Sequence, residues 1–468
     1  MRPGVHALAR RPRRGGAPPP DRPGRRGLRR PHLVPPAPAG RTVPAPGRAG
    51  ARRAPDRSAA VKVLCYTSPA RGHLFPTVPI LLELRGRGHD VVVRTLDAEV
   101  ARLRDLGLKA EPISPEIEAI ELDDYRARTS QAGLKRTVRT FAARARIEVP
   151  EVQRLVAEEH PDLLLVDGNT WGAAAVAEAS GLPWALLQHF PTPLPARDVP
   201  PFGPGLRPLA GPLGRLRNRL LRPVVLGVVE RAFLPPLNEV VRPLAGASPI
   251  RDAHDLYTRA PLTLYPTSRA FEHPRTDWPD SFCFVGPLVW EPPTAPPEWL
   301  AELGRPVALV TTSSEYQDDG ALVDAALAGL AHEDLDVVAT LPGGSRPRRL
   351  VPANAHVEQF VPHSPVLARA AVAVTHGGMG ATQKALAAGV PVVVVPWGRD
   401  QAEVARRAEA TGAAVLLPRR RLSPTSLRDA VRRARRLRPA AVALAAAMAQ
   451  DGGAPLAVDR LESLAGRG

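Results

Sequence analysis

The hydrophobic positions of the chain form short continuous runs that alternate with longer segments of helical periodicity. The short runs, rich in β-branched residues, are typical of buried strands, and the longer segments are typical of amphipathic helices. In the first half, strands are predicted at 61–67, 90–95, near 108, 163–166 and 184–188, and helices at about 76–85, 97–106, 135–158 and 171–179. This alternation predicts βαβ units and a parallel sheet with helices on both faces.

The second half repeats the pattern after a proline-rich stretch at 286–305, which we interpret as a linker. Strands are predicted at 307–311, 337–340, 356–360, 372–375 and 392–395, and helices near 321–330, 379–388, 401–410 and 424–437. We therefore expect an α/β protein with two facing, doubly wound, Rossmann-like domains at 61–285 and 306–468, the second ending in helices. Because ligands of such sheets bind beyond the carboxyl ends of the strands, the cleft between the domains is the expected site.

Residues 191–250 interrupt the alternation. This stretch is rich in proline and glycine and then presents two apolar helices that contain arginines, predicted at 213–221 and 224–233. Two interpretations are open: a helical insertion on the surface, or the lid or wall of an apolar pocket.

Most of the net positive charge lies in the amino-terminal segment. The net charge is +17, but residues 1–60 hold fifteen arginines and two acidic residues, which gives 15 − 2 = +13 there and 17 − 13 = +4 for the rest. The segment has almost no apolar periodicity and no aromatic residue, which predicts disorder and offers no ring for stacking on nucleic-acid bases. We interpret it as translated upstream sequence, a disordered tail or a basic arm, and expect no nucleic-acid partner.

The apolar runs and the two cysteines indicate the cellular compartment in which the protein is expected. No uninterrupted apolar run approaches the ~20 residues of a membrane span. Cys65 and Cys283 are the only cysteines and lie far apart in the sequence, so neither a disulfide framework nor a cysteine-based metal site is expected. We therefore expect a cytoplasmic protein without a membrane span.

The most informative segment for chemistry is the glycine-rich run at 374–383, which a predicted strand enters and a predicted helix leaves. It reads Val-Thr-His-Gly-Gly-Met-Gly-Ala-Thr-Gln. Its glycines let backbone amides approach a ligand closely, and the helix amino terminus favours negative charge, so the run suits a diphosphate with His376 as a side-chain donor. It is neither a Walker A loop nor a GxGxxG fingerprint, which disfavours a nucleotide triphosphatase or a dehydrogenase. Taken alone, it could also be a tight turn that serves packing only.

Two nearby segments favour the ligand interpretation. Asp400 and Gln401 open a predicted helix, where they could bond to sugar hydroxyls, although Asp400 could equally cap the helix. Phe360 ends a predicted strand and offers a ring that could stack on a nucleobase.

The span from Phe360 to Gln401 resembles the nucleotide-sugar signature of the glycosyltransferase superfamily that includes plant secondary-product and bacterial macrolide enzymes. The carboxyl-terminal half is similar to the erythromycin-type desosaminyltransferase domain. The likeness covers most of 61–468 in layout and about forty residues in specific motif. It implies the GT-B type of fold, with a UDP- or dTDP-sugar donor bound by the second domain.

The resemblance also assigns positions in the donor site. Phe360 stands where the family has a base-stacking Trp, and His363 stands where Gln is common. The donor-binding residues that the resemblance implies are Ser313, Ser314, Phe360, Val361, His363, His376, Gly378, Met379, Gly380, Ala381, Thr382, Asp400 and Gln401.

One position departs from the family pattern. Eight residues after His376, many relatives carry a Glu that binds the ribose hydroxyls, whereas this chain has Lys384. A cation cannot accept those hydroxyl bonds but could pair with phosphate, so the choice between UDP and dTDP stays open.

The first domain supplies the expected catalyst. Arg71-Gly72-His73-Leu74-Phe75-Pro76 resembles the family's Gly-His-x-x-Pro loop, whose histidine is the general base. Imidazole suits that role because it is neutral and basic near pH 7. The family's orienting acid lies about a hundred residues further on, and Asp167, after a predicted strand, meets that description. The structural alternative is that both residues only cap helices.

Together these features predict an inverting glycosyltransferase that moves a hexose or deoxyhexose from a UDP- or dTDP-sugar to a hydroxyl of a small lipophilic acceptor. A polyketide, macrolide, flavonoid or sterol-like aglycone is expected. The sequence holds no carboxylate cluster with metal-binding spacing, so neither a metal nor a cofactor beyond the nucleotide sugar is expected. The alternatives are a nucleotide-sugar epimerase and a non-catalytic sugar-nucleotide-binding auxiliary protein, the latter favoured by Lys384.

Overall fold

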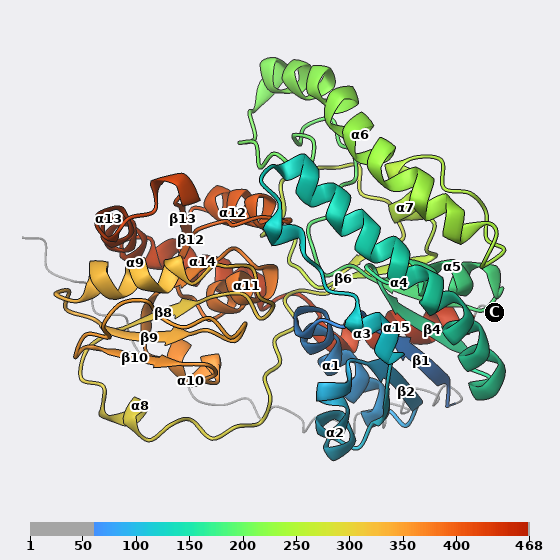
Figure 1. The fold of residues 1–468 in the computed structure, drawn as a ribbon, viewed down its shortest axis with the longest axis horizontal. Coiled ribbons are helices and arrows are strands. Elements are labelled where there is room, and N and C mark those ends of the chain that lie inside the picture. The colour runs from blue at the N-terminus through green and yellow to red at the C-terminus, as the bar shows by residue number, and fades with distance from the viewer. Residues whose placement is uncertain (1–59, 467–468) are drawn as a thin grey trace, which may run out of the picture. The chain divides into compact units, whose positions relative to one another are not determined.

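Two parallel sheets organise the chain in the computed structural model, which describes residues 60–466 (Figure 1). The first sheet has the strand order β3-β2-β1-β4-β5-β6-β7, and the second has the order β10-β9-β8-β11-β12-β13. All their strand pairs are parallel. The predicted fold class, two Rossmann-like α/β sheets, is confirmed. The predicted tail at 1–60 lies outside the described residues except for its last position.

The first sheet and its helices form what we call the first lobe. Its strands are β1 (Lys62–Tyr66), β2 (Asp90–Thr95), β3 (Lys109–Pro112), β4 (Leu163–Asp167), β5 (Trp184–Leu187), β6 (Leu262–Tyr265) and β7 (Phe282–Phe284). Its helices are α1 (Arg71–Gly86), α2 (Asp97–Asp105), α3 (Pro115–Ala119), the 3-10 turn η1 (Asp124–Arg126), α4 (Ser130–Glu159), α5 (Trp171–Ala179), α6 (Gly211–Val241) and α7 (Ala253–Thr258). The chain order reverses between β1 and β4, which is where a doubly wound sheet opens a ligand crevice.

The second sheet and its helices form the second lobe. Its strands are β8 (Val307–Thr311), β9 (Asp336–Thr340), β10 (Ala355–Glu358), β11 (Ala370–Thr375), β12 (Val392–Val394) and β13 (Ala414–Leu416). The helices from residue 299 onward are α8 (Trp299–Glu302), α9 (Ala321–Leu330), α10 (His363–Leu367), α11 (Met379–Ala387), α12 (Gln401–Ala410), the 3-10 turn η2 (Arg419–Arg421), α13 (Pro424–Arg435), α14 (Arg438–Met448) and α15 (Gly453–Ala465). The switch point of this sheet lies between β8 and β11.

The helix that follows β1 begins earlier than the sequence predicts. The predicted start at about 76 is wrong, because α1 begins at Arg71 and so carries His73 in its first turn. Proline favours the first position of a helix, which made Pro76 look like the start. In the structure Pro76 lies inside α1, and the Thr77 hydroxyl donates a 2.8 Å bond to the carbonyl of His73. The base predicted to lie in a loop is therefore held by a helix.

The predicted pair of helices in the 191–250 insertion is one helix, α6, with Pro223 inside it. The sequence favoured a break there because proline removes a backbone bond to the residue four positions earlier. That residue, Arg219, is exposed, so water can satisfy the free carbonyl.

The last helix, α15, packs on the first lobe rather than on the second. Its Val458 and Leu461 are buried in one apolar cluster with Val63 of β1 and Leu81 of α1. The Glu462 carboxylate lies 2.9 Å from Nε2 of His89. The predicted boundaries of the two domains stay a prediction, but the chain evidently returns to its first sheet before it ends.

Two features bear on the expected compartment. By length and composition, 438–465 is apolar enough to cross a membrane. It forms two helices of 11 and 13 residues, α14 and α15, each shorter than the ~20 residues that a span needs. Cys65 and Cys283 are free thiols. The cytoplasmic location stays a prediction.

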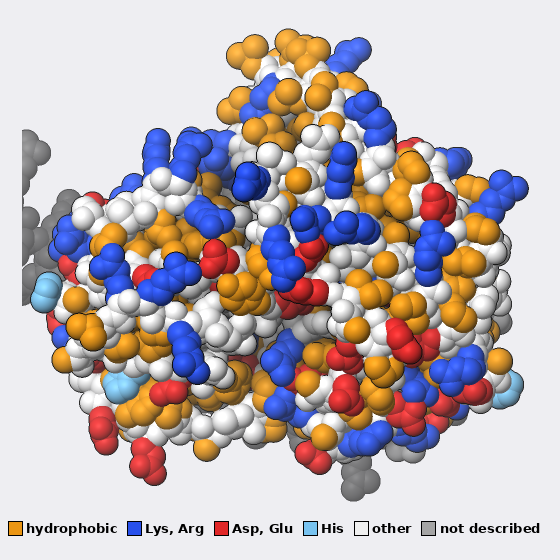
Figure 2. Space-filling view, in the orientation of Figure 1, with side chains coloured by type: hydrophobic (Ala, Val, Ile, Leu, Met, Phe, Trp, Pro, Cys, Tyr) orange, Lys and Arg blue, Asp and Glu red, His pale blue; other side chains and the backbone are white. Residues whose placement is uncertain are grey.

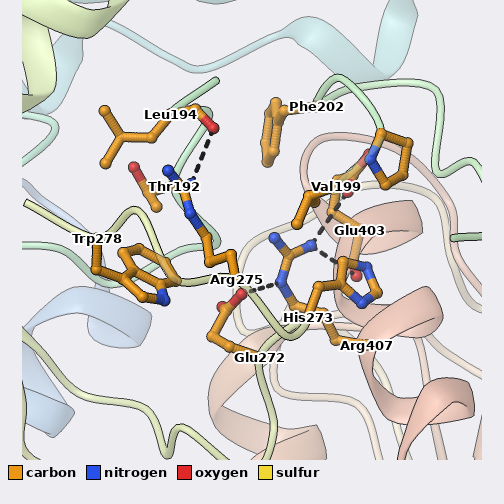
Figure 3. A pocket seen from close by; sticks show the side chains of 11 residues that line it. Thr192, Leu194, Val199, Phe202, Glu272, His273, Arg275, Trp278, Glu403 and Arg407 are labelled. Carbon is orange, nitrogen blue, oxygen red and sulfur yellow. Dashed lines mark hydrogen bonds and ion pairs between the residues drawn. The ribbon is translucent and has the colours of Figure 1, made fainter. Parts of the chain in front are cut away.

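A buried cluster of charged side chains joins α12 to the first lobe, as Figure 3 shows. The Arg407 guanidinium donates to Glu272 at 2.7 Å and to Glu403 at 3.1 Å, and each of the three side chains is at most 4% exposed. The other oxygen of Glu403 accepts from the backbone amides of Gly203 and Gly205. One arginine therefore neutralises two carboxylates that hold segments from both lobes together.

Replacing Arg407 with methionine is expected to lower the free energy of unfolding by about 3–5 kcal/mol, because it leaves Glu272 and Glu403 buried without a cation. The denaturant midpoint, followed by far-UV circular dichroism, measures the loss. The matched control is Arg432→Met on α13, which breaks only the exposed ion pair with Glu333 and should shift the midpoint little. Equal shifts of the denaturant midpoint in the two variants would contradict the expectation that the buried cluster contributes more to stability than the exposed ion pair.

Candidate active site

His73 and Asp167 meet at the switch point of the first sheet. β1 and β4 are neighbours, with Tyr66 opposite Val166, so the segments that leave their carboxyl ends lie side by side. β1 leads into α1, which carries His73, and Asp167 is the last residue of β4. Nδ1 of His73 lies 2.9 Å from both carboxylate oxygens of Asp167.

Asp167 is fully buried but well supplied with hydrogen-bond donors. One oxygen accepts from the Ser68 amide at 3.0 Å and hydroxyl at 2.6 Å, and the other accepts from the Asn169 amide at 2.9 Å. Burial alone would raise the pKa of Asp167, but His73 and Ser68 outweigh it and hold that pKa well below its usual value. An ionised Asp167 accepts from Nδ1–H of His73, which leaves Nε2 as the nitrogen that can take a proton.

The two histidines at this site differ in charge behaviour. Burial opposes protonation of His73, yet the neighbouring Asp167 outweighs burial and raises the pKa of His73 above its ordinary value. His189, with its ring centroid 5.0 Å from that of His73, is fully neutral near pH 7 because burial lowers its pKa to about 3. Its Nδ1 has no hydrogen-bond partner among the described residues. His73, Asp167 and His189 have ligand atoms within 4.8 Å of one another and could hold a metal ion, so the expected absence of a metal stays a prediction.

Loops of the second lobe lie beside this pair. A Cβ placed on Gly72 would lie 4.0 Å from Oγ of Ser314. After Asp167, the carboxylates of Glu315 and Asp400 also raise the pKa of His73. Carboxylates from the segments that follow β8 and β12 in the second lobe therefore act electrostatically on the imidazole of His73 in the first lobe.

The glycine-rich turn connects β11 to α11. Gly377 has a φ of +95°, which favours glycine, and a Cβ on Gly378 would lie 2.4 Å from Nε2 of His376. Burial lowers the pKa of His376 to about 4, and its Nδ1 has no partner among the described residues. A neutral imidazole and unobstructed amides thus lie at the amino end of α11.

The other residues of this turn divide between the core and the surface. Met379 packs in an apolar cluster with members from both lobes, and the Thr382 hydroxyl lies 3.1 Å from that of Thr375. Gly380 is exposed, and Ala381 is half-buried. Only the backbone of this stretch is therefore well placed to meet a ligand.

Asp400 and Gln401, which were predicted to bind the sugar, differ in the hydrogen bonds of their side chains. Oε1 of Gln401 accepts from the amides of Trp397 and Gly398, and its amide nitrogen donates to Gln317, so its side chain supports its own loop. Asp400 makes no side-chain capping bond, and burial raises its pKa. Asp400 occupies the N-cap position of α12, but because its side chain makes no capping bond, the capping interpretation of that side chain is wrong, and no other side chain from 60 to 466 bonds to its carboxylate.

The expected base-binding segment follows β10. Phe360 is 47% exposed, whereas Val361 beside it is buried. His363 begins α10, and its Nε2 lies 3.1 Å from Oγ1 of Thr340. Burial lowers the pKa of His363 to about 4. In the loop after β8, Ser313 is buried, and its amide donates to Asp319 at 2.7 Å.

Lys384 forms an ion pair instead of standing free. Its Nζ lies 2.9 Å from Oε1 of Glu291, a residue of the predicted linker. The carboxylate of Glu291 also accepts from the His363 amide and from the amide and hydroxyl of Ser364. Lys384 and these donors hold the pKa of Glu291 at about 2, against the effect of burial, so the pair stays charged.

Comparison with known proteins decides the family. The family described as "Erythromycin biosynthesis protein CIII-like, C-terminal domain" matches residues 324–464. The 4'-demethylrebeccamycin synthase of Lentzea aerocolonigenes is 36% identical over 384 residues, which cover 79% of this chain and 91% of that protein. The chain belongs to the secondary-metabolite glycosyltransferases. It is a nucleotide-sugar-dependent transferase of small aglycones, which decides against the epimerase and auxiliary-protein alternatives.

Solved structures of other glycosyltransferases share the fold. The calicheamicin glycosyltransferase CalG4 has a TM-score of 0.68 and 22% identity, covering 87% of this chain and 99% of that one. The glycosyltransferase VinC, solved in complex with dTDP, has a TM-score of 0.62 and 24% identity, covering 87% of this chain and 100% of that one. The present glycosyltransferase therefore has the GT-B fold.

Several residues at the site of this glycosyltransferase gave no signal in the sequence. Glu291 reaches Lys384 across 93 positions. Arg399, with an unusual φ of +55°, bonds to Asp124 of the first lobe and to Glu315 of the second. His189 lies near His73 only because β5 and β4 are neighbours. Asn169 was also not predicted, although it stands two positions after Asp167; its side-chain nitrogen lies 3.3 Å from Nε2 of His73.

The pH dependence of this glycosyltransferase should follow His73. A general base must be unprotonated, and the pKa of His73 is raised above 6.5, so kcat/KM should fall as the pH drops through an apparent pKa higher than 6.5. Initial rates measured from pH 5 to 9 with saturating donor test this. An acidic limb that lies below 6.5 would contradict the influence of Asp167.

Proposed function

We propose that this glycosyltransferase moves a hexose or deoxyhexose from a dTDP-sugar to a hydroxyl of a small lipophilic aglycone, with inversion at the anomeric carbon. The observation that carries the proposal is the 2.9 Å contact of His73 with Asp167, beside loops of the second lobe. Nε2 of His73 takes the hydroxyl proton while the acceptor oxygen bonds to the anomeric carbon. The bond from that carbon to the diphosphate breaks on the opposite side, so an α-linked donor gives a β-glycoside.

The departing diphosphate needs stabilisation of its negative charge. The amino end of α11 offers free backbone amides and the positive end of the helix dipole, and His376 adds a neutral donor. Donors that are already in place where charge develops lower the barrier without reorganisation. This arrangement supports departure of a nucleoside diphosphate without a metal in the proposed mechanism.

The acceptor is proposed to bind in an apolar pocket next to the catalytic pair. Gly168, which follows Asp167, lines the pocket together with Trp171, Trp184, Leu237 and Tyr257. Aromatic and aliphatic walls favour a flat lipophilic molecule. Leu237 belongs to the carboxyl half of α6, so this part of the insertion serves as the pocket wall. The relative's name, 4'-demethylrebeccamycin synthase, supports an aglycone of the secondary-metabolite kind.

The preference for dTDP rests on Lys384 and Glu291. A UDP ribose carries one more hydroxyl than the deoxyribose of dTDP, and the ammonium of Lys384 cannot accept a bond from it. The nearby carboxylate of Glu291 already accepts from Lys384, His363 and Ser364. The dTDP complex of VinC supports the same choice.

A donor screen by thermal shift tests the proposal. We expect dTDP and dTDP-sugars to raise the melting temperature more than UDP and UDP-sugars at equal concentration. The product formed from an α-linked donor and an aglycone panel should show the β-configuration by proton NMR coupling. Stabilisation by UDP alone would overturn the donor choice, and an α-glycoside would overturn inversion.

A further inference from the structure

The amino-terminal half of α6 turns an apolar stripe outward. Its large apolar side chains are exposed to an unusual degree: Leu213 by 79%, Leu216 by 53%, Leu220 by 63% and Val224 by 63%. Spacings of three and four residues place them on one face of the helix. The residues Gly214 and Asn218, on another face, are buried. The wall of the acceptor pocket uses only the other end of α6, so this stripe has no part in it.

Arginines accompany the stripe. From 199 to 229 the chain holds five arginines and no acidic residue. Arg215 and Arg219 are exposed and lie on the polar side of the helix, and Arg215 approaches Asp198 at 3.6 Å. Arg219 forms no ion pair with any residue from 60 to 466. Figure 2 shows hydrophobic and basic side chains gathered over the region that Figure 1 labels α6.

We propose that this half of α6 lies on the surface of an anionic lipid bilayer. A helix with an apolar stripe and arginines on its polar side rests in the plane of the interface, with the stripe among the acyl chains and the guanidinium groups at lipid phosphates. Charge complementarity selects this occupant. A second copy, joined symmetrically through the same stripe, would cover the apolar side chains but would give Arg219, on the polar side, no anionic partner.

Vesicle flotation with the full-length protein tests the apolar part. Binding is expected to vesicles of phosphatidylcholine with phosphatidylglycerol, and much less to phosphatidylcholine alone. The double variant Leu213→Ser/Leu220→Ser should lower the partition coefficient by about tenfold or more, since it removes two inserting side chains. The matched control is Leu350→Ser/Val351→Ser, which changes exposed apolar residues far from α6 in the sequence and should bind like the wild type.

A second pair of variants tests the charge. Arg215→Gln/Arg219→Gln should weaken binding to the anionic vesicles by about tenfold. Arg433→Gln/Arg436→Gln alters two exposed arginines at the end of α13 and lowers net charge equally, so it should have little effect. All variants keep the fifteen arginines of residues 1–60, so a difference between them reports on α6.

Three results would overturn the proposal. The first is equal binding to neutral and anionic vesicles, and the second is an equal loss in a control and in its α6 counterpart. The third is a concentration-dependent dimer that the Leu213→Ser/Leu220→Ser variant abolishes in analytical ultracentrifugation, which would assign the stripe to a second copy. Donor binding does not involve these residues, so none of these results bears on the proposed transfer.

Discussion

Replacing His73 with alanine is expected to lower kcat of sugar transfer by about 10²–10⁴-fold. The substitution removes Nε2, the atom proposed to take the acceptor proton, and leaves Asp167 without the partner 2.9 Å away. The residues proposed to bind the donor lie in the second lobe, so the dissociation constant for dTDP should change little. Steady-state kinetics and isothermal titration calorimetry measure the two quantities separately.

The matched control for His73 is His89, another histidine bonded to a carboxylate. Nε2 of His89 lies 2.9 Å from Glu462, and its Nδ1 accepts from the Val61 amide, in a place that the mechanism does not use. His89→Ala should lower the melting temperature but keep kcat. Wild-type turnover in the His73→Ala variant would show that the base is another group.

Replacing Asp167 with asparagine should also lower kcat by about 10²–10⁴-fold. Both oxygens of Asp167 accept from N–H or O–H groups of Ser68 and Asn169, so whichever atom becomes the amide nitrogen faces a donor. The variant also loses the charge that raises the pKa of His73. The acidic limb of the pH–rate profile should therefore move to lower pH, even though the maximal rate is small.

Glu151→Gln is the control for this variant. Glu151 is a buried carboxylate of the same lobe that accepts from the Tyr66 hydroxyl at 2.9 Å and from the Ser114 amide at 3.0 Å. Its replacement changes charge by the same amount without touching His73. If Glu151→Gln shifted the pH–rate profile as much as Asp167→Asn, the shift would come from a loss of protein stability. It would then not show that Asp167 is paired with His73.

Apolar runs were enough to predict most strands. β8 and β2 were predicted to the residue, because each contains at least three consecutive aliphatic residues. β6 and β7 were missed, since they have only four and three residues and lie among prolines and turns. β13, also of three residues, was missed for the same reason.

The residues of the site that stand at the ends of strands were predictable from the sequence. His73 and Asp167 each follow an apolar strand, and parallel strands bring such positions together. The inward side chain of Gln401 was not predictable, because it bonds to the turn that precedes it and to Gln317. Likewise, nothing in the sequence near Lys384 indicated that a carboxylate from the predicted linker would neutralise it. Such contacts depend on the packing of whole segments.

The return of α15 to the first sheet has a consequence for how this polypeptide matures and can be recombined. Val63, in the first strand that the structure describes, and Leu461 of α15 are buried in one apolar cluster, so that cluster is complete only once α15 is present. During synthesis, the first lobe can therefore close this cluster only after residue 461 has been translated. Chimeras that exchange the amino-terminal half between related enzymes should therefore carry residues 453–465 along with it.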